Sequence, residues 1–170
     1  NAAGGNATKS RLGVEWVKAG EASVGRSGKS FGLMTSQRTG LTQAVFAYGL
    51  VVVSDIDGQR IVAMNAADGE EQWAHHVGGR VEFPPTLYRG LCLFAARDGW
   101  VHCLDAKTGE QLYSESPHRQ TYRASPVAGD GKIYITSRDG MVTVLQAGRE
   151  FKVLSKNKLG GGLTASPAPS

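Results

Sequence analysis

Side chains that can do chemistry or bind a partner gather between residues 97 and 113 of this 170-residue chain. The stretch reads RDGWVHCLDAKTGEQLY and places an indole (Trp100), an imidazole (His102) and a thiol (Cys103) close together. Trp100 and His102 would share one face of a β-strand, because successive side chains of a strand point to opposite faces. We expect His102 to be a half-buried strand histidine with one satisfied nitrogen, and the pair to be a candidate contact for a partner.

Trp100 follows a turn, and the sequence leaves its role open. A large aromatic at this point could be exposed and anchor a partner, or it could cap the core of its own sheet. The repeat described below places Gln59 and Met141 in the corresponding positions, so the fold does not require an aromatic there. Arg97 and Arg138 each precede an Asp-Gly turn and could line one rim as a weakly basic feature.

The other candidate ligands give little support for a metal site. His75 and His76 are adjacent, so in a strand their side chains point to opposite faces and cannot easily bind one metal ion. The Asp-Ile-Asp-Gly segment at 55–58 has the start of a calcium loop, but Arg60 occupies the place of the required glycine and Ala66 that of the bidentate glutamate. We therefore predict no metal ligand, no cofactor ligand and no catalytic residue.

The two cysteines, Cys92 and Cys103, are expected on adjacent strands of one hairpin, in diagonal rather than directly opposed positions. Diagonal neighbours usually lie too far apart for normal disulfide geometry. The pair also lacks the Cys-x-x-Cys spacing of a zinc site. We predict two buried free thiols.

Composition argues against two classes of partner. The net charge is +4, but the lysines and arginines are scattered rather than clustered, so we expect no nucleic acid partner. Hydrophobic residues make up 41% of the chain, and no apolar run approaches the roughly 18 residues that a membrane helix needs. We therefore expect no direct membrane insertion.

An internal repeat of 41 residues must position these side chains. Four residues share this spacing: Ala44, Pro85, Pro126 and Pro167. The same interval separates the Asp-Gly pairs that begin at residues 57, 98 and 139. Each unit contains short apolar runs between turn signals and no window with helical periodicity, which indicates a blade of four antiparallel strands. The fold class predicted is therefore an all-β propeller.

The repeat divides the chain into blades at 40–80, 81–121 and 122–162. Residues 1–39 are expected to form a leading segment or a partial preceding blade, and residues 163–170 the first strand of a truncated further blade. Closed propellers typically contain four or more blades. We therefore predict a partial propeller of three full blades, completed by the remaining blades of a larger propeller.

Four strands are expected in the second blade, and the third and fourth enclose a recurring motif. The strands are Pro85–Leu87, Leu91–Ala95, Trp100–Asp105 and Glu110–Tyr113. The motif reads Ala-x-Asp/Asn-x-x-Asp/Thr-Gly-Glu/Lys-x-x-Trp and occurs twice, with Cys103 in place of the leading alanine in its second copy. Its members are Ala63, Asn65, Gly69, Trp73, Asp105, Gly109 and Tyr113.

This motif resembles the tryptophan-docking motif of the PQQ-like (pyrroloquinoline-quinone-type) β-propeller repeat family, in its outer-membrane-assembly-factor-B-like branch. The resemblance implies that the closing aromatic, Trp73 or Tyr113, packs between neighbouring blades, while the Asp/Thr-Gly pair makes the turn before it. In the third unit Gln146 replaces the acidic residue and Leu154 stands where the aromatic was. Docking of that blade should therefore be weaker.

The resemblance implies two alternative roles. Some members of the family are quinoprotein dehydrogenases that hold PQQ and calcium on the propeller axis, next to a pair of adjacent cysteines. Others are non-catalytic scaffolds for protein partners or ligands, located in the periplasm or elsewhere outside the cytoplasm. Because this chain has no adjacent cysteines, we expect a scaffold without catalytic activity or cofactor, and keep a fragment of a PQQ-dependent dehydrogenase as the alternative.

Overall fold

The computed structural model describes the following residues: 8–9, 15–16, 40–117, 121–122 and 124–159. In this part of the chain there are three antiparallel sheets of four strands, one two-stranded pair and no helix. Accordingly, the described residues include no helix long and apolar enough to cross a membrane. The predicted all-β architecture with blades of four strands is confirmed.

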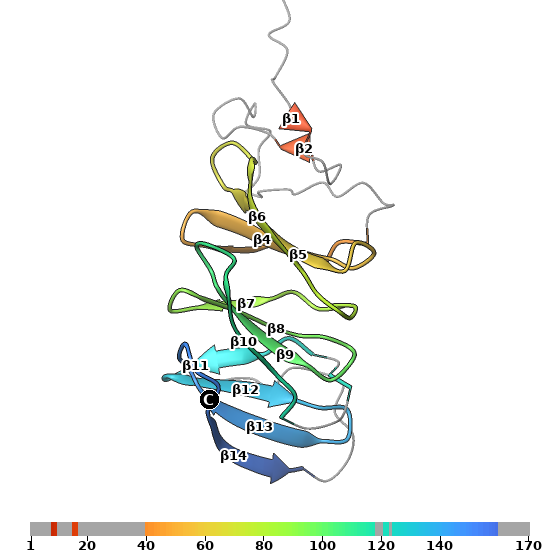
Figure 1. Cartoon of the computed structure of the whole chain (residues 1–170), viewed down its shortest axis with the longest axis vertical. Coiled ribbons are helices and arrows are strands. Elements are labelled where there is room, and N and C mark those ends of the chain that lie inside the picture. Colours follow the sequence, from red (N-terminus) through yellow and green to blue (C-terminus); the bar gives the residue numbers. More distant parts are fainter. Residues whose placement is uncertain (1–7, 10–14, 17–39, 118–120, 123, 160–170) are drawn as a thin grey trace, which may run out of the picture.

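Each four-stranded sheet is one blade, and its strands pair in chain order. Blade 1 contains β3 (Val45–Ala47), β4 (Leu50–Asp55), β5 (Arg60–Asn65) and β6 (Glu71–His76). Blade 2 contains β7 (Thr86–Tyr88), β8 (Leu91–Ala95), β9 (Val101–Asp105) and β10 (Gln111–Glu115). Blade 3 contains β11 (Val127–Gly129), β12 (Lys132–Thr136), β13 (Met141–Gln146) and β14 (Val153–Lys158). The blades stack face against face along the long axis of the molecule (Figure 1).

The ends of the chain are described only in part. The two-stranded pair of β1 (Thr8–Lys9) and β2 (Glu15–Trp16) falls within the predicted leading segment at 1–39. The other residues of that segment lie outside the described residues, as does the strand predicted at 163–170.

Two-residue turns connect the first and second strands of all three blades. The residues are Tyr48-Gly49, Arg89-Gly90 and Asp130-Gly131, and both members of each pair have positive φ. This is the backbone of a type I′ turn, whose twist matches that of the strands it joins. The repeated glycine at the second position supplies this conformation without the steric cost that a side chain would add.

Strand pairing corrects two correspondences that the 41-residue interval predicts. Asp55 pairs directly with Arg60, which leaves four residues in the turn between β4 and β5. In blade 2 the Ala96 N–H donates to the Trp100 carbonyl oxygen, which leaves three residues in the turn between β8 and β9. Arg60 rather than Gln59 therefore corresponds to Trp100. In blade 3, Val144 pairs with Ser155 just as Cys103 pairs with Tyr113 in blade 2. Ser155, and not Leu154, therefore stands in the place of the closing aromatic.

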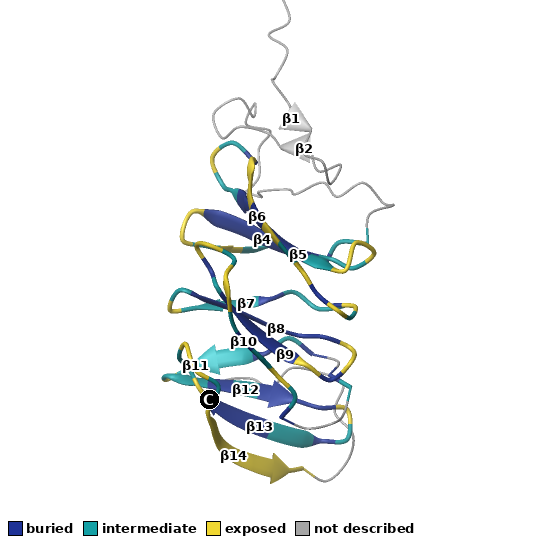
Figure 2. Ribbon diagram, viewed as in Figure 1, coloured by how far each residue is buried: buried dark blue, intermediate teal, exposed yellow. Residues whose placement is uncertain are grey.

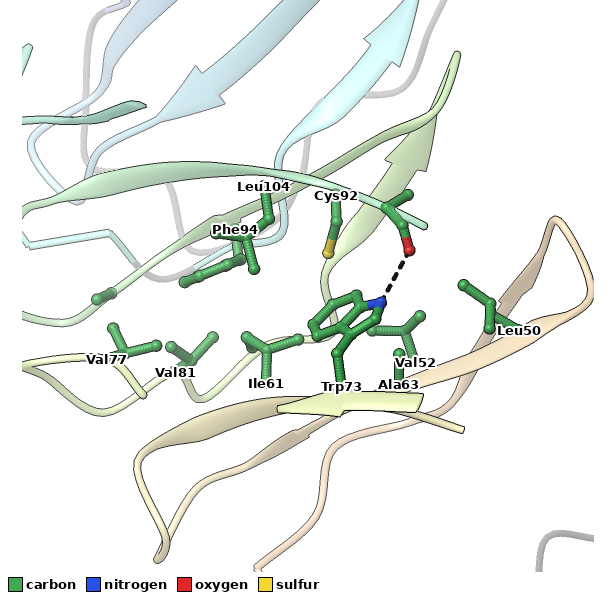
Figure 3. Close-up of a cluster of buried hydrophobic side chains, with 12 residues drawn as sticks. Leu50, Val52, Ile61, Ala63, Trp73, Val77, Val81, Cys92, Phe94 and Leu104 are labelled. Carbon is green, nitrogen blue, oxygen red and sulfur yellow. Dashed lines mark hydrogen bonds between the residues drawn. The ribbon is translucent and has the colours of Figure 1, made fainter. Parts of the chain in front are cut away.

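Two of the three clusters of buried hydrophobic residues lie between neighbouring blades, and the third consists of residues of blade 1 alone. One cluster joins blades 1 and 2 and includes Leu50, Ile61, Trp73, Cys92 and Phe94 (Figure 3). A second cluster joins blades 2 and 3. All five residues of β8 are buried, because both faces of blade 2 are covered by a neighbouring blade (Figure 2). By contrast, all six residues of β14 are exposed.

Trp73 docks blade 1 onto blade 2. Its side chain is 8% exposed, and its indole Nε1–H donates a hydrogen bond to the carbonyl oxygen of Ala106 at 3.1 Å (Figure 3). The indole rests on Gly109, where a Cβ atom would lie only 2.6 Å from Trp73 Cδ2. Gly109 has φ +74° and ends a turn in which its N–H donates to the carbonyl oxygen of Asp105. The glycine therefore serves both the turn and the docked indole.

A repeated turn brings each docking residue into place. In blade 1 the Asn65 side chain accepts the N–H of Ala67, and in blade 2 Asp105 accepts the N–H groups of Lys107 and Thr108. The first motif position lies beside the aromatic, because Ala63 pairs with Trp73 and Cys103 with Tyr113. Gly69 has φ +76° and donates to the Asn65 carbonyl oxygen, as Gly109 does to that of Asp105.

We predict that Gly109→Ala destabilises the protein more than Gly90→Ala. Both glycines have positive φ, so each substitution should cost about 1 kcal/mol in backbone strain. No atom lies within 4 Å of a Cβ at Gly90, whereas the Cβ at Gly109 overlaps the Trp73 indole, which should add about 2 kcal/mol. Urea unfolding of both variants measures this difference, and equal losses of stability would contradict the docking geometry.

Candidate functional site

Trp100 lies at the end of the turn that connects β8 and β9. Its backbone N–H donates to the Asp98 carboxylate at 3.1 Å, and its side chain is 43% exposed. The indole is not part of any of the buried hydrophobic clusters that the described residues form. Of the two roles that the sequence left open, the structure therefore places Trp100 at the surface and not over the core.

His102 is buried in the joint between blades 1 and 2, that is, in the packed interface whose buried cluster includes Trp73 and Phe94. Its ring stacks on Phe94, with ring centroids 4.9 Å apart and an interplanar angle of 12°. Nδ1 lies 3.0 Å from the hydroxyl of Ser114, while Nε2 is buried and has no hydrogen-bond partner. The side chain is only 7% exposed, so His102 lies deeper than the half-buried position expected for it. One nitrogen is satisfied, as expected.

Burial lowers the pKa of His102 from 6.5 to about 4, because a charged imidazole loses its hydration there. Asp98 opposes this shift, and His75 of blade 1 adds to it. His75 is half-buried on β6, and Gln111 of blade 2 acts to raise its pKa. Burial lowers the pKa of His75 as well, and the adjacent His76 contributes in the same direction.

The electrostatic effect of His75 on His102 in the neighbouring blade was not predicted from the sequence, where His75 was compared only with its neighbour His76. A signal was available. His75 stands two residues after Trp73, so both share the strand face that docks on blade 2. His76 is exposed.

The two rim arginines differ in their surroundings. Arg97 forms an ion pair with Glu82 at 2.9 Å, so much of its charge is balanced. Arg138 is exposed at the corresponding turn of blade 3. The predicted basic rim is thus partly neutralised.

The acidic groups near residues 55–58 are already engaged. The Asp55 carboxylate accepts the N–H of Gly58 and pairs with Arg60 at 2.9 Å, and Asp57 pairs with Arg80 at 3.2 Å. Calcium needs six to eight oxygen ligands, and this arrangement does not fit such a site. Within the described residues, no group of three or more histidine, cysteine or acidic side chains could hold a metal ion.

The two cysteines are free and buried, as predicted. Cys92 pairs with Leu104 and Cys103 with Leu93, so the two side chains are offset by one position and point to opposite faces of the sheet. Cys92 faces the joint between blades 1 and 2, and Cys103 faces the joint between blades 2 and 3. Burial raises the pKa of Cys103 to about 11 and that of Cys92 further.

Successive four-stranded blades joined by docked aromatic residues define a β-propeller of the tryptophan-docking type. The family model described as outer membrane protein assembly factor BamB matches residues 14–154. The chain belongs to this family.

Comparison with individual proteins agrees with this assignment. BamB of Escherichia coli is 26% identical over 84 residues, which are 49% of this chain and 21% of that protein. BamB from Moraxella catarrhalis superposes with a TM-score of 0.61 and 16% identity, over 69% of this chain and 36% of that one. Quinohemoprotein alcohol dehydrogenase ADHIIG from Pseudomonas putida superposes with a TM-score of 0.59 and 18% identity, over 68% of this chain and 20% of that one. The two structural likenesses show a shared fold, and the chain spans about a fifth to a third of these relatives.

We predict that neither thiol reacts appreciably with a disulfide reagent such as 5,5′-dithiobis(2-nitrobenzoate) at pH 8 in the folded chain. Both are shielded from solvent, and their raised pKa values leave little of the reactive thiolate. Absorbance of the released thiol should indicate two equivalents only after denaturation. Rapid reaction of either cysteine in the native chain would contradict this account of the joints.

Proposed function

We propose that this chain is part of a non-catalytic propeller that acts as a scaffold for a protein partner. The observation that carries the proposal is the exposure of Trp100, a large apolar side chain held at the rim of blade 2. Buried tryptophans dominate the binding energy of many protein interfaces, and an exposed tryptophan gains most when a partner covers it. Arg138 gives the same rim an exposed cation that an acidic group of the partner could pair with.

The arrangement of ionisable groups favours a scaffold over an enzyme. Asp55, Asp57 and Asp105 at the turns accept backbone hydrogen bonds or pair with arginines. The thiols and His102 are buried in the joints between blades. None of these groups is placed to act on a substrate at the surface. We propose on this basis that the chain needs no PQQ and no calcium.

The same proposal includes a location and a larger assembly. The Escherichia coli relative is named as an outer membrane protein assembly factor, and a scaffold of that kind would work in the periplasm or elsewhere outside the cytoplasm. The remaining blades of a larger propeller would cover the exposed β14. Neither nucleic acid nor insertion into a membrane forms part of the proposed function.

Photo-crosslinking tests the proposed contact. Benzoylphenylalanine at position 100 should give a defined protein adduct in an extract of the bacterial cell envelope. At position 107, an exposed site at the other end of β9, it should give none. Trp100→Ala should weaken binding of the captured partner at least tenfold while leaving the melting temperature within about 2 °C, since the indole packs in no core cluster.

Two results would overturn the proposal. Equal or absent adducts at positions 100 and 107 would remove Trp100 as the contact. Quinone absorbance that stays with the full-length protein after PQQ and calcium are added and free PQQ is removed would instead support the dehydrogenase alternative.

A further inference from the structure

His102 occupies a position where a positive charge cannot be accommodated without movement. Its ring stacks on Phe94, which is fully buried in the hydrophobic cluster between blades 1 and 2. The hydroxyl of Ser114 satisfies Nδ1, and Nε2 faces the buried interior without a partner. The environment therefore suits an imidazole that carries a single proton.

A second proton would leave a buried donor unsatisfied. In neutral imidazole one nitrogen donates and the other accepts, and a hydroxyl such as that of Ser114 can serve either role. In the imidazolium both nitrogens donate, so Nε2–H would require an acceptor that the joint does not supply. Burying an unpaired charged donor is costly, and opening the joint to water would remove that cost.

The groups around His102 have opposite effects on its pKa. Asp98, on the turn that precedes β9, favours the charged imidazole. His75 faces it from β6 of blade 1 and disfavours the charge, and the next residue of that strand, His76, is exposed. From β8, Cys92 shares the buried cluster as a neutral thiol, and Ser114 of β10 is not titratable. The only balancing charge among these groups is that of Asp98.

We propose that protonation of His102 loosens the joint between blades 1 and 2, so that the contact between these two blades depends on pH. The sign follows from proton binding. The closed joint binds this proton with a pKa of about 4, whereas an exposed histidine has 6.5. Between these values the open form binds more protons, so the joint is fully stable above about pH 6.5 and weakens as the pH falls towards 4.

The next joint provides a control inside the same chain. The position of His102 is occupied by Val62 in blade 1 and by Thr143 in blade 3, as the strand pairings show. The buried Thr143, which belongs to the strand that packs against blade 2, does not titrate. Of the two described joints, only the one between blades 1 and 2 should therefore depend on pH through the residue at the position of His102.

The two cysteines report on the two joints separately, because Cys92 faces the first and Cys103 the second. Labelling with 4,4′-dithiodipyridine, which reacts at acidic pH, is measured in single-cysteine chains made by Cys103→Ala or Cys92→Ala. Each rate is divided by that of the unfolded chain at the same pH, which gives the equilibrium constant for opening. For Cys92 this constant should rise roughly 10- to 30-fold from pH 7.5 to pH 5, while that for Cys103 stays within about twofold.

Variants at the histidines separate the proposal from a general loss of stability. His102→Val should remove most of the rise at Cys92 and leave only the smaller part that His75 contributes, because burial lowers the pKa of His75 as well. His102→Thr, which introduces the residue of blade 3, serves if the valine chain does not fold. His75→Gln should reduce the rise, because removing a neighbouring positive charge makes the protonated form of His102 less costly. The proposal is overturned if the rise at Cys92 is undiminished without His102, or if Cys92 and Cys103 respond equally.

Discussion

The docking of Trp73 onto blade 2 is the contact on which the rest of the described structure depends. A four-stranded sheet has two faces, and each must be covered if its apolar residues are to leave water. Here the coverage comes from the next blade, and the indole closes the gap near the outer strand, held by Ala106 and seated on Gly109. Tyr113 occupies the same place in the second joint, where its ring packs edge-on against Phe151.

This dependence explains why chemistry and architecture occupy different places in the chain. Groups that are reactive in water, such as the thiols and His102, lie in the joints, where burial suppresses their charged forms. Groups at the turns are held in local hydrogen bonds and ion pairs. Trp100 differs from both sets, since it is large, apolar and exposed. A surface that binds without catalysis is consistent with this distribution.

Much of the fold could be predicted from the sequence because turns leave residue signatures. The predicted strand Leu91–Ala95 agrees with β8 at both ends, and the predicted starts at Trp100 and Glu110 precede β9 and β10 by one residue each. The 41-residue interval failed where one turn is a residue longer than its counterpart, at Arg60 and at Ser155. A fixed interval counts residues along the chain, whereas correspondence in space follows the hydrogen-bonded pairs. Alternation places His75 on the strand face that docks on blade 2, but it does not identify His102 as the residue of the next blade whose charge His75 affects.

A double-mutant cycle between Trp73→Leu and Gly109→Ala tests the central claim most directly. Leucine is smaller than the indole and leaves room for the alanine methyl group, so the two losses of stability should not add. The account predicts that the double variant is more stable than the sum of the single losses by about 1 kcal/mol or more. Losses in the free energy of unfolding that add to within about 0.3 kcal/mol would show that the indole does not rest on Gly109, and would contradict the docked joint.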